Sequence, residues 1–468
     1  MKVVILVPDG VGVKNYLFSS FIDKLQAQAR EVIIFHKLSK SAIKEIQVHK
    51  PKLRGFFEMY EFIESPKTRF LRETLAYARL LRNKKKLNNK TILKFWSPNK
   101  KGVKKKLLYF LAEIVGFIFS KSYCFVLFGD KIFESTIKKT KQTILYNDVF
   151  RKIKPDMVLN LHQRSPLVSP VISAANELNI TTASVIFSWD NIPKARLVNR
   201  YDSYFVWSDL MKKELKKLYP EIHKNQIKVT GTPQFEFYFD ENLKDDKATF
   251  FKKHGLDIHK KIICFSGDDE LTSPFDAQYL EDICKAVVDF PEEEQPQILF
   301  RRCPVDFSER YDEVIKKYKF VVKIDPDWRV EKNTIKTTFS AIYPSFNDIK
   351  LLVNTCLHSD VVINLGSTMA HDFATLNKPC LYLNYTPVTN NYWSTNTVYT
   401  FEHFKSMQGL DPVGWINDKS ELKEKIQEVL AFPNKVAKDK KLWLKKIVHH
   451  PLENNTKKLV DTIKELLN

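Results

Sequence analysis

The sequence has little of what several protein classes depend on. Only 12 of its 468 residues are glycine, which excludes collagen-like and glycine-repeat architectures. Its six cysteines are scattered along the chain, and no two of them form a Cys-x-x-Cys pair. A disulfide framework or a zinc knuckle is therefore unexpected, and a reducing cytoplasm fits this use of cysteine.

Long hydrophobic runs are also missing. The most apolar stretch, LLYFLAEIVGFIF at residues 107–119, contains Glu113 and is shorter than the ~18–20 residues that a membrane-spanning helix needs. We expect it to form a buried or interfacial helix. The apolar run at residues 3–7 ends at Pro8 and is too short for the core of a signal peptide, so a strand is predicted there.

Positive charge is what the sequence has in excess. Its 75 Lys and Arg against 55 Asp and Glu give a formal net charge of +20, which excludes an acidic solvating protein. The excess favours polyanionic partners: nucleotide phosphates, an anionic membrane or nucleic acid. More than half of it comes from residues 82–106, which carry eleven Lys or Arg and no acid. Those cations are Arg82, Lys84, Lys85, Lys86, Lys90, Lys94, Lys100, Lys101, Lys104, Lys105 and Lys106.

The basic segment has few features of a nucleic-acid site. Its aromatic residues are only Phe95 and Trp96, too few for a stacking ladder, and it contains no RNA-binding motif. We therefore expect no nucleic-acid partner. A solvated helical face and an anionic membrane surface both remain explanations, and the apolar stretch that follows favours the membrane.

The remaining composition is that of a globular protein with two or three domains, at 44% hydrophobic and 28% charged residues. Short β-branched segments alternate with helical ones in both halves of the chain, which predicts parallel sheets covered on both faces. The fold class is therefore α/β, with two doubly wound Rossmann-like domains facing each other across a cleft. The expected strands cover residues 3–7, 31–35, 156–161, 182–188, 204–208 and 227–231 in the first half, and 261–267, 297–302, 320–324, 339–343, 361–366 and 380–385 in the second.

Changes in periodicity and charge suggest the domain limits. The first domain is expected at residues 1–240, interrupted at about 40–150 by a mostly helical, basic insertion. A linker is expected at about 233–250, where periodicity fades, and the second domain at 250–440. Residues 441–468 read as amphipathic helices that pack back on the first domain.

The most informative motif is DVVINLGSTMAHDFATLNKPCLYLNY at residues 360–385. A buried strand ends at Gly366, and Ser367 and Thr368 open a helix whose exposed N–H groups and positive end suit an anion. Asp372 follows one turn later, where its carboxylate could accept hydrogen bonds from ribose hydroxyls. Ordinary helix capping also explains a Gly-Ser-Thr turn, but the whole string is more specific.

Two other strand ends offer donor-binding candidates. Arg301 and Arg302 end the strand at 297–302, where a guanidinium could hold a phosphate with two hydrogen bonds. Ser266 and Gly267 lie at the same expected sheet edge. A surface salt bridge for the arginines and a plain turn for the other two residues are the alternatives.

Three residues of the first half could act as general base, and each follows a strand: Asp9, His162 and Asp190. His162 fits best, because imidazole titrates near neutral pH. A structural histidine remains an alternative. For Asp190 the alternative is a turn before Pro193 in which the carboxylate bonds to its own backbone.

These segments together resemble the GT-B glycosyltransferases of bacterial surface-polysaccharide biosynthesis and the related CDP-glycerol glycerophosphotransferases. The resemblance covers both halves of the chain. It is carried by PDGVGVKNYL (8–17), HQRSP (162–166), IFSWDNIPKARL (186–197), VWSDLMKKEL (206–215), VTGTPQF (229–235) and GSTMAHDFATLNKP (366–379).

The resemblance implies transfer of a group from a nucleotide-sugar donor, held by the second domain, to a glycan or lipid-linked glycan acceptor, held by the first. It implies no bound metal and no cofactor, since the nucleotide-sugar is a substrate. It also implies a cytoplasmic enzyme that is peripheral on the inner face of the cell membrane. The acceptor-binding residues that it suggests are Gly12, Gln163, Arg164, Trp189 and Asn191.

The sequence departs from two related patterns. Glycerophosphotransferases usually end the corresponding strand in Arg-x-His-Pro, whereas this chain has Cys303 where that histidine would be. Sugar transfer is therefore favoured, with glycerol-phosphate transfer as the alternative. Nucleotide-sugar 2-epimerases, a second alternative, carry a Gly-His-Arg-x-Glu-Asn string where this chain reads CFSGDDELTSP (264–274), which counts against an isomerase.

Overall fold

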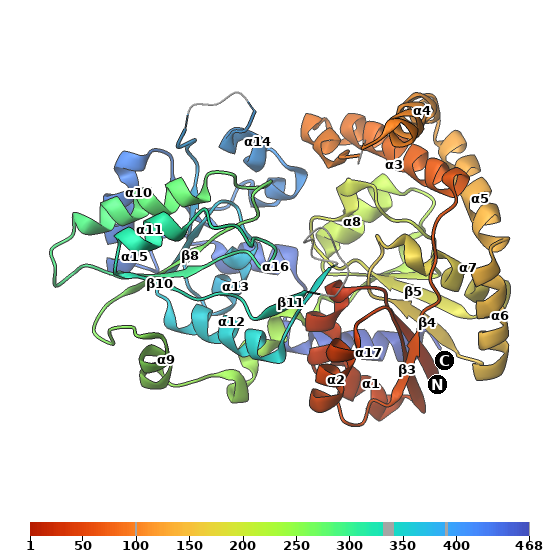
Figure 1. The fold of residues 1–468 in the computed structure, drawn as a ribbon, viewed down its shortest axis with the longest axis horizontal. Helices are drawn as coiled ribbons and strands as arrows, with labels where there is room; N and C mark the ends of the chain where they lie inside the picture. The colour runs from red at the N-terminus through yellow and green to blue at the C-terminus, as the bar shows by residue number, and fades with distance from the viewer. Residues whose placement is uncertain (99–100, 331–340, 389–391, 468) are drawn as a thin grey trace. The chain divides into compact units, whose positions relative to one another are not determined.

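The computed structural model describes residues 1–98, 101–330, 341–388 and 392–467 (Figure 1). The chain forms two compact units. Unit 1 consists of Met1–Pro233, Phe401–His403 and Ile447–Asn468, and unit 2 consists of Gln234–Thr400 and Phe404–Lys446. Lys100 of the basic segment lies outside the described residues.

Unit 1 is built on a seven-stranded parallel sheet with the strand order β3-β2-β1-β4-β5-β6-β7. Its central strands are rich in Val, Ile and Leu and almost entirely buried, because helices cover both faces. The doubly wound α/β fold expected from the sequence is confirmed. The strands are β1 (Lys2–Val7), β2 (Glu31–His36), β3 (Gly55–Glu58), β4 (Met157–Asn160), β5 (Thr181–Val185), β6 (Ser203–Val206) and β7 (Ile227–Val229).

The helices of unit 1 fall into two groups. The helices that cover the sheet are α1 (Phe21–Gln28), α2 (Lys40–His49), α6 (Lys141–Ile153), α7 (Ser169–Glu177), α8 (Asp209–Leu218) and α17 (Asn455–Glu465). The others are inserted before α6, and they are α3 (Pro66–Leu87), α4 (Val103–Phe119) and α5 (Tyr123–Lys138). Ser65 begins the insertion by capping α3 with its side chain, and Pro66 fits the first helical position.

The insertion is shorter than the 40–150 expected from the sequence. Residues 40–58 contain α2 and β3, and β3 pairs with β2 as the edge of the sheet. The sequence GFFE is only four residues long and lacks a β-branched run, so no strand was predicted there. None of the helices in the described part of the chain is long and apolar enough to cross a membrane.

Unit 2 is built on a six-stranded parallel sheet with the order β10-β9-β8-β13-β14-β15. Its strands are β8 (Ile262–Ser266), β9 (Gln297–Arg301), β10 (Val321–Lys323), β13 (Val361–Asn364), β14 (Cys380–Leu383) and β15 (Gly414–Ile416). Its helices are α9 (Lys247–His254), α10 (Asp276–Val288), α11 (Asp312–Lys317), α12 (Phe346–His358), α13 (Met369–Thr375), α14 (Thr395–Tyr399), α15 (Leu422–Ala431) and α16 (Lys440–Ile447).

One expected strand has a different role. Residues 339 and 340 of the strand predicted at 339–343 lie outside the described residues. The part that follows forms β12 (Ile342–Pro344), which pairs antiparallel with β11 (Trp328–Val330) as a separate two-stranded sheet. β12 therefore does not extend the parallel sheet.

The segment expected to be a linker, residues 233–250, begins with a packed helical turn instead of an exposed loop. Residues Pro233–Phe239 form a 3-10 helix, and Phe235, Phe237 and Tyr238 are buried. Burying these three aromatic side chains is favourable, so the stretch packs against the protein although its apolar periodicity is weak. The chain passes between the compact units at Pro233, before the limits at 240 and 250 expected from the sequence.

The C-terminal helix α17 packs against α1 in unit 1 (Figure 1). Gly231, which follows β7, is buried and has a φ of +74°. A Cβ atom at this position would lie 2.2 Å from Cγ of Asn455, the first residue of α17. The absence of a side chain at Gly231 thus permits the close approach of the sheet and the C-terminal helix.

Gly231→Ala should destabilise the protein by about 2–4 kcal/mol, since it adds left-handed backbone strain and a steric clash with Asn455. Calorimetric melting should show a clear fall in the unfolding temperature. Gly255→Ala is the control, because Gly255 has a φ of +67° but nothing within 4 Å of its Cβ position. Equal shifts for the two variants would contradict the packing argument.

Candidate active site

Two of the three base candidates form one pair in unit 1. Asp9 follows β1 and His162 follows β4, and these neighbouring parallel strands end at the same edge of the sheet. Asp9 Oδ2 lies 2.7 Å from Nδ1 of His162, and both side chains are largely buried. The pair is a carboxylate–imidazole dyad in which Asp9 fixes the orientation of the ring.

Neighbouring groups hold both members of the Asp9–His162 pair. Asp9 Oδ1 accepts a hydrogen bond from the backbone N–H of Val11 at 3.1 Å. The backbone N–H of His162 donates to Oδ1 of Asn160 at 3.1 Å. The ring of Phe187 contacts the His162 ring edge-on, with centroids 4.9 Å apart. The imidazole is therefore held on several sides.

Gln163 and Gly12, two predicted acceptor-binding residues, support the pair from within the fold. Gln163 is buried, and its Oε1 accepts a hydrogen bond from the N–H of Phe187 at 3.3 Å. A Cβ atom on Gly12 would lie 3.0 Å from Cβ of Leu161, so the glycine lets the loop after β1 approach the end of β4. This geometry assigns both residues a positioning role, and their contact with an acceptor stays a prediction.

Asp190, the third base candidate, lies in a polar cluster of unit 1. Its carboxylate accepts hydrogen bonds from the Ser188 hydroxyl at 2.6 Å and the Asn191 amide at 2.9 Å, and it pairs with Lys194 at 2.5 Å. Burial would raise its pKa, but the charge of Lys194 and the hydrogen bonds from Lys194 and Ser188 outweigh burial, and the pKa lies well below the usual range. A carboxylate that stays ionised is a weak proton acceptor, so the geometry favours His162 as base.

Residues from distant parts of unit 1 complete this cluster. The Trp189 ring contacts the His403 ring edge-on at a centroid distance of 4.8 Å. Burial lowers the pKa of His403 to about 4, against the opposing effect of Asp190, so this imidazole is neutral at pH 7. His403 could not be predicted from the sequence, because it lies more than 200 residues after Asp190 and outside any recognisable motif.

Arg164 presents a cationic group with few partners. Its Nη1 donates to Oδ1 of Asn191 over 3.5 Å, and among the described residues no carboxylate oxygen lies within 4 Å of its guanidinium. Burial lowers the pKa of this half-buried side chain, although Asp190 and Asp9 partly offset the effect. An arginine with such weak local bonding is suited to a polar or anionic group of a substrate.

Glu214 on α8 is a second group that the sequence analysis missed. Burial, followed by the negative charges of Glu402 and Asp190, raises its pKa to about 8. Glu402 itself accepts a hydrogen bond from the Asn89 amide at 2.9 Å. The carboxylates of Glu214, Glu402 and Asp190 therefore lie in one region. Glu214 has the fewest positive charges and hydrogen bonds to offset its burial, so it is the one that takes up a proton. No local pattern could have indicated this, because the sequence places lysines on both sides of Glu214.

In unit 2, the turn after β13 has the form that the motif suggested. Gly366 has a φ of +69°, and a Cβ atom there would lie 2.8 Å from Phe404. The N–H of Ser367 donates to Oδ1 of Asn364 at 2.9 Å. Thr368 stands exposed at the start of α13, without a side-chain cap. The binding of a diphosphate at this turn stays a prediction.

Three predicted donor-binding side chains are engaged within unit 2. Asp372 is 4% exposed and accepts a hydrogen bond from the Tyr238 hydroxyl at 2.8 Å. Arg301 is 5% exposed and its Nη2 lies 2.7 and 3.0 Å from the two carboxylate oxygens of Asp348. Arg302 pairs with Asp325 at 2.9 Å. The structure therefore gives no support to ribose binding by Asp372 or phosphate binding by the arginines.

Ser266 and Gly267 lie at the carboxyl end of β8, and both are buried. The N–H of Gly267 donates to the carbonyl of Arg301 at 3.0 Å, and a Cβ atom on this glycine would lie 2.7 Å from the Tyr311 hydroxyl. Burial raises the pKa of the neighbouring Asp276 to about 6.

Among the described residues, no group of three or more His, Cys, Asp or Glu side chains is placed to hold a metal ion.

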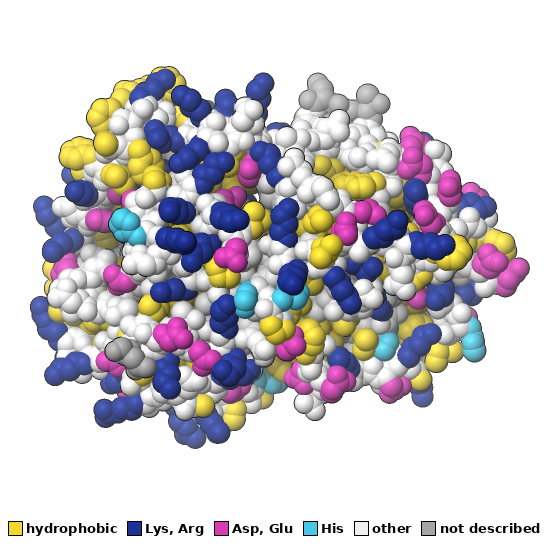
Figure 2. All heavy atoms as spheres, turned by 180° about the vertical axis from the view of Figure 1, so that it is seen from behind, with side chains coloured by type: hydrophobic (Ala, Val, Ile, Leu, Met, Phe, Trp, Pro, Cys, Tyr) yellow, Lys and Arg dark blue, Asp and Glu magenta, His cyan; other side chains and the backbone are white. Residues whose placement is uncertain are grey.

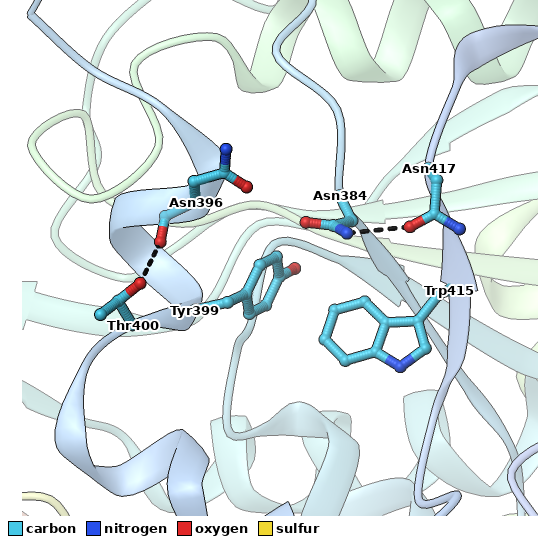
Figure 3. A pocket seen from close by; sticks show the side chains of 6 residues that line it. All are labelled: Asn384, Asn396, Tyr399, Thr400, Trp415 and Asn417. Carbon is cyan, nitrogen blue, oxygen red and sulfur yellow. Dashed lines mark hydrogen bonds between the residues drawn. The ribbon is translucent and has the colours of Figure 1, made fainter.

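The same edge of this sheet carries a cavity of about 540 Å³ that is wide open to solvent, beyond the ends of β14 and β15 (Figure 3). The side chains that line it are Asn384, Asn396, Tyr399, Thr400, Trp415 and Asn417. None of these positions was singled out from the sequence. They come from three separate segments that only the fold brings together.

Comparisons with known proteins place the chain in a family. Residues 137–465, more than two thirds of the chain, match the family described as CDP-Glycerol:Poly(glycerophosphate) glycerophosphotransferase. The chain belongs to this family. A teichoic acid poly(ribitol-phosphate) polymerase of Bacillus spizizenii is 24% identical over 194 residues, covering 41% of this chain and 28% of the relative's own length.

Solved structures share the GT-B fold. A UDP-GlcNAc 2-epimerase from Neisseria meningitidis superimposes with a TM-score of 0.51 at 11% identity, covering 99% of this chain and 100% of that one. A glycosyltransferase from Rickettsia africae gives a TM-score of 0.53 at 12% identity, covering 100% of this chain and 98% of that one. At these identities the likeness shows the fold alone, and both glycosyltransferases and epimerases have it.

Membership of the glycerophosphotransferase family agrees with the family resemblance read from the sequence motifs. The matched range begins within α5, so it includes His162 and Asp190 and leaves Asp9 outside. The Asp9–His162 pair thus joins a residue inside the family region to one before it.

Glu214 should make the stability of the protein depend on pH. Because its folded-state pKa lies above the ordinary 4.5, its contribution to stability is complete below about pH 4.5 and is lost as the pH rises through 8. Glu214→Gln should remove about 2–4 kcal/mol of the fall in stability between pH 5 and 8.5.

Melting temperatures of wild type and Glu214→Gln across this pH range test the expectation. Glu61→Gln is the control, because Glu61 is an exposed glutamate of the same unit. Parallel pH profiles for wild type and Glu214→Gln would show that Glu214 is not protonated in the folded state at neutral pH.

Proposed function

We propose that this protein is a GT-B transferase that moves a sugar from a nucleotide-sugar donor to a glycan acceptor in the synthesis of a bacterial surface polymer. The Asp9–His162 pair is the observation that carries the proposal, since it supplies an oriented base at a sheet edge. Membership of a family of polymer-forming transferases supports the reaction class.

The chemistry follows from the hydrogen bond within the pair. With Asp9 accepting from the Nδ1–H of His162, the lone pair of Nε2 is left to take the proton of an acceptor hydroxyl. The acceptor oxygen then forms a bond to the anomeric carbon of the donor sugar, and the bond from that carbon to the diphosphate oxygen breaks. The diphosphate leaves with the bonding electrons, and Asp9 stabilises the imidazolium that has formed.

Sugar is proposed as the transferred group because Cys303 stands where glycerophosphotransferases usually have a histidine. Burial raises the pKa of the Cys303 thiol, so it cannot replace that histidine in proton transfer or phosphate binding. Glycerol phosphate is the second candidate, and the family membership favours it. Incubation with CDP-glycerol and with a panel of nucleotide-sugars, followed by detection of the released nucleotide, distinguishes the two candidates.

We further propose that the protein acts at the inner face of the cell membrane, on a lipid-linked acceptor. Helices α4 and α5 expose a row of large apolar side chains, of which Val103 is 82% and Phe110 is 57% exposed. Figure 2 shows hydrophobic side chains beside lysines and arginines at the top left, where the inserted helices lie. The exposed apolar residues are Val103, Leu107, Phe110, Leu111, Ile114, Phe117 and Ile118 of α4, with Phe125 and Phe128 of α5.

This apolar surface suits insertion into the boundary between lipid headgroups and acyl chains. Lys104, Lys105 and Lys106 lie in the first turns of the same helix and would meet anionic headgroups. A cationic start followed by an exposed apolar face is the pattern of a helix that lies in the membrane surface.

His162→Ala should lower kcat by about 10²- to 10⁴-fold while leaving donor affinity near that of wild type, since it removes the base alone. Asp9→Asn should lower kcat less, because the imidazole remains but loses its orienting charge. Steady-state kinetics and nucleotide titration separate the two quantities. His223→Ala serves as the control, because His223 is an exposed histidine of the same unit. Full turnover by His162→Ala would refute the assignment of the base.

Membrane binding should depend on both parts of α4. Co-sedimentation with phosphatidylglycerol vesicles should weaken by about 100- to 200-fold when Lys104, Lys105 and Lys106 become Gln, at about 1 kcal/mol for each lysine. The double variant Phe110→Ser, Phe117→Ser should also lose binding. Ile144→Ser is the control, since Ile144 is 57% exposed on α6. Binding that is unchanged in both test variants, or equal on phosphatidylcholine, would refute the membrane proposal.

A further inference from the structure

The cavity beyond β14 and β15 has a polar floor. The N–H of Asn384 donates to the carbonyl of Ile416 at 2.7 Å, which continues the pairing of the two strands. Nδ2 of Asn384 also donates to Oδ1 of Asn417 at 2.8 Å (Figure 3). Fixing the two carboxamides against each other leaves Oδ1 of Asn384 as an acceptor and Nδ2 of Asn417 as a donor.

Two aromatic rings form the wall of the cavity. Tyr399 and Trp415 meet edge to face, with centroids 4.8 Å apart and ring planes at 84°. The Tyr399 hydroxyl donates to the carbonyl of Leu383 at 2.7 Å, and the ring of Tyr382 lies behind both. Since these contacts fix the ring positions, the wall is already formed without a ligand.

The chemistry of the lining selects the kind of ligand. All six lining side chains are uncharged, so a phosphate or diphosphate would find no cation to neutralise it among them. Carboxamides and hydroxyls both donate and accept hydrogen bonds, as sugar hydroxyls do. The C–H face of a sugar ring is apolar and can lie against the aromatic wall. A volume of about 540 Å³ falls within the range of small-molecule sites.

The cavity adjoins the turn at Gly366. A Cβ atom built on Gly366 would lie 3.4 Å from Cε1 of Tyr399, so the ring that lines the cavity also contacts the turn. A ligand with an anionic part at the turn and a neutral ring in the cavity would thus place its two parts side by side.

We propose that this cavity binds the neutral sugar ring of the donor, with Trp415 and Tyr399 against the ring face and Asn384 and Asn417 bonded to its hydroxyls. That the bound sugar belongs to the donor rests on the proposed function. It also distinguishes between the two candidate reactions, because glycerol phosphate has no ring to lie on the aromatic wall and carries a charge that the lining does not meet.

Saturation-transfer NMR on the full-length chain tests the cavity without requiring any turnover. The probes are glucose, galactose and N-acetylglucosamine, with glycerol 3-phosphate, cytidine and uridine for comparison. We expect at least one monosaccharide to bind, with its C–H protons receiving the strongest transfer. Binding by a nucleoside or glycerol 3-phosphate but by no monosaccharide would overturn the proposal.

Two variants locate the binding. Asn417→Asp places a negative charge in the lining at an exposed position that should not affect folding, and it should weaken monosaccharide binding at least tenfold. Trp415→Ala should abolish binding. Tyr392→Ala is the control, because Tyr392 is 67% exposed and does not line the cavity. Equal monosaccharide binding by wild type and Asn417→Asp would overturn the proposal.

The outcomes for the cavity and for the enzyme are separable. Sugar binding that depends on Asn417 in a protein without transfer activity would uphold the cavity and refute the proposed function. Sugar transfer that is unaffected by Asn417→Asp would refute the cavity and uphold the proposed function.

Discussion

The pairing of β1 with β4 is the interaction on which the candidate active site depends. The two strands run parallel with Leu6 opposite Asn160, so the loops that leave them start from the same edge of the sheet. This brings Asp9 and His162 together although 153 positions separate them in the chain. Short parallel strands buried on both faces leave little freedom in that register, because a slip would expose their apolar side chains.

Burial then decides what each charged group can do. Asp190 and Glu214 are carboxylates of the same unit whose pKa values move in opposite directions. The positive charge of Lys194 offsets the burial of Asp190, whereas the charges that act on Glu214 include those of Glu402 and Asp190. Removing water penalises any charge, so the sign of the neighbouring charges determines which carboxylate stays ionised.

The same rule explains why some plausible ligand-binding residues serve the fold. Arg301 and Asp348 lie almost wholly inside unit 2, where each compensates for the burial of the other. Asp372 lies against the Tyr238 hydroxyl instead of facing solvent. A charged residue at the end of a buried strand can bind a ligand only where the neighbouring helix does not already supply its partner. The sequence around Arg301 contains no sign of Asp348, which lies on α12.

The sequence by itself determined the α/β class, nearly all strands of both parallel sheets and the turn at Gly366, and it offered Asp9 and His162 as separate candidates for the general base. These features follow from local apolar periodicity and from the rule that polar residues after parallel strands gather at one edge. Strands β3 and β15 could not be predicted, because they are only four and three residues long and are strands through their pairing with β2 and β14.

Only the tertiary structure decided which candidates meet and which are buried. In the tertiary structure His403 and Glu214 lie close enough to Asp190 to interact with its charge. Arg301 and Asp372 are buried inside unit 2, where other residues are their partners. The cavity is lined by residues of three separate segments, among them Asn384, Tyr399, Trp415 and Asn417. Hydrogen bonds, desolvation and cavity shape all depend on distances between residues far apart in the chain, and local sequence patterns carry no information about those distances.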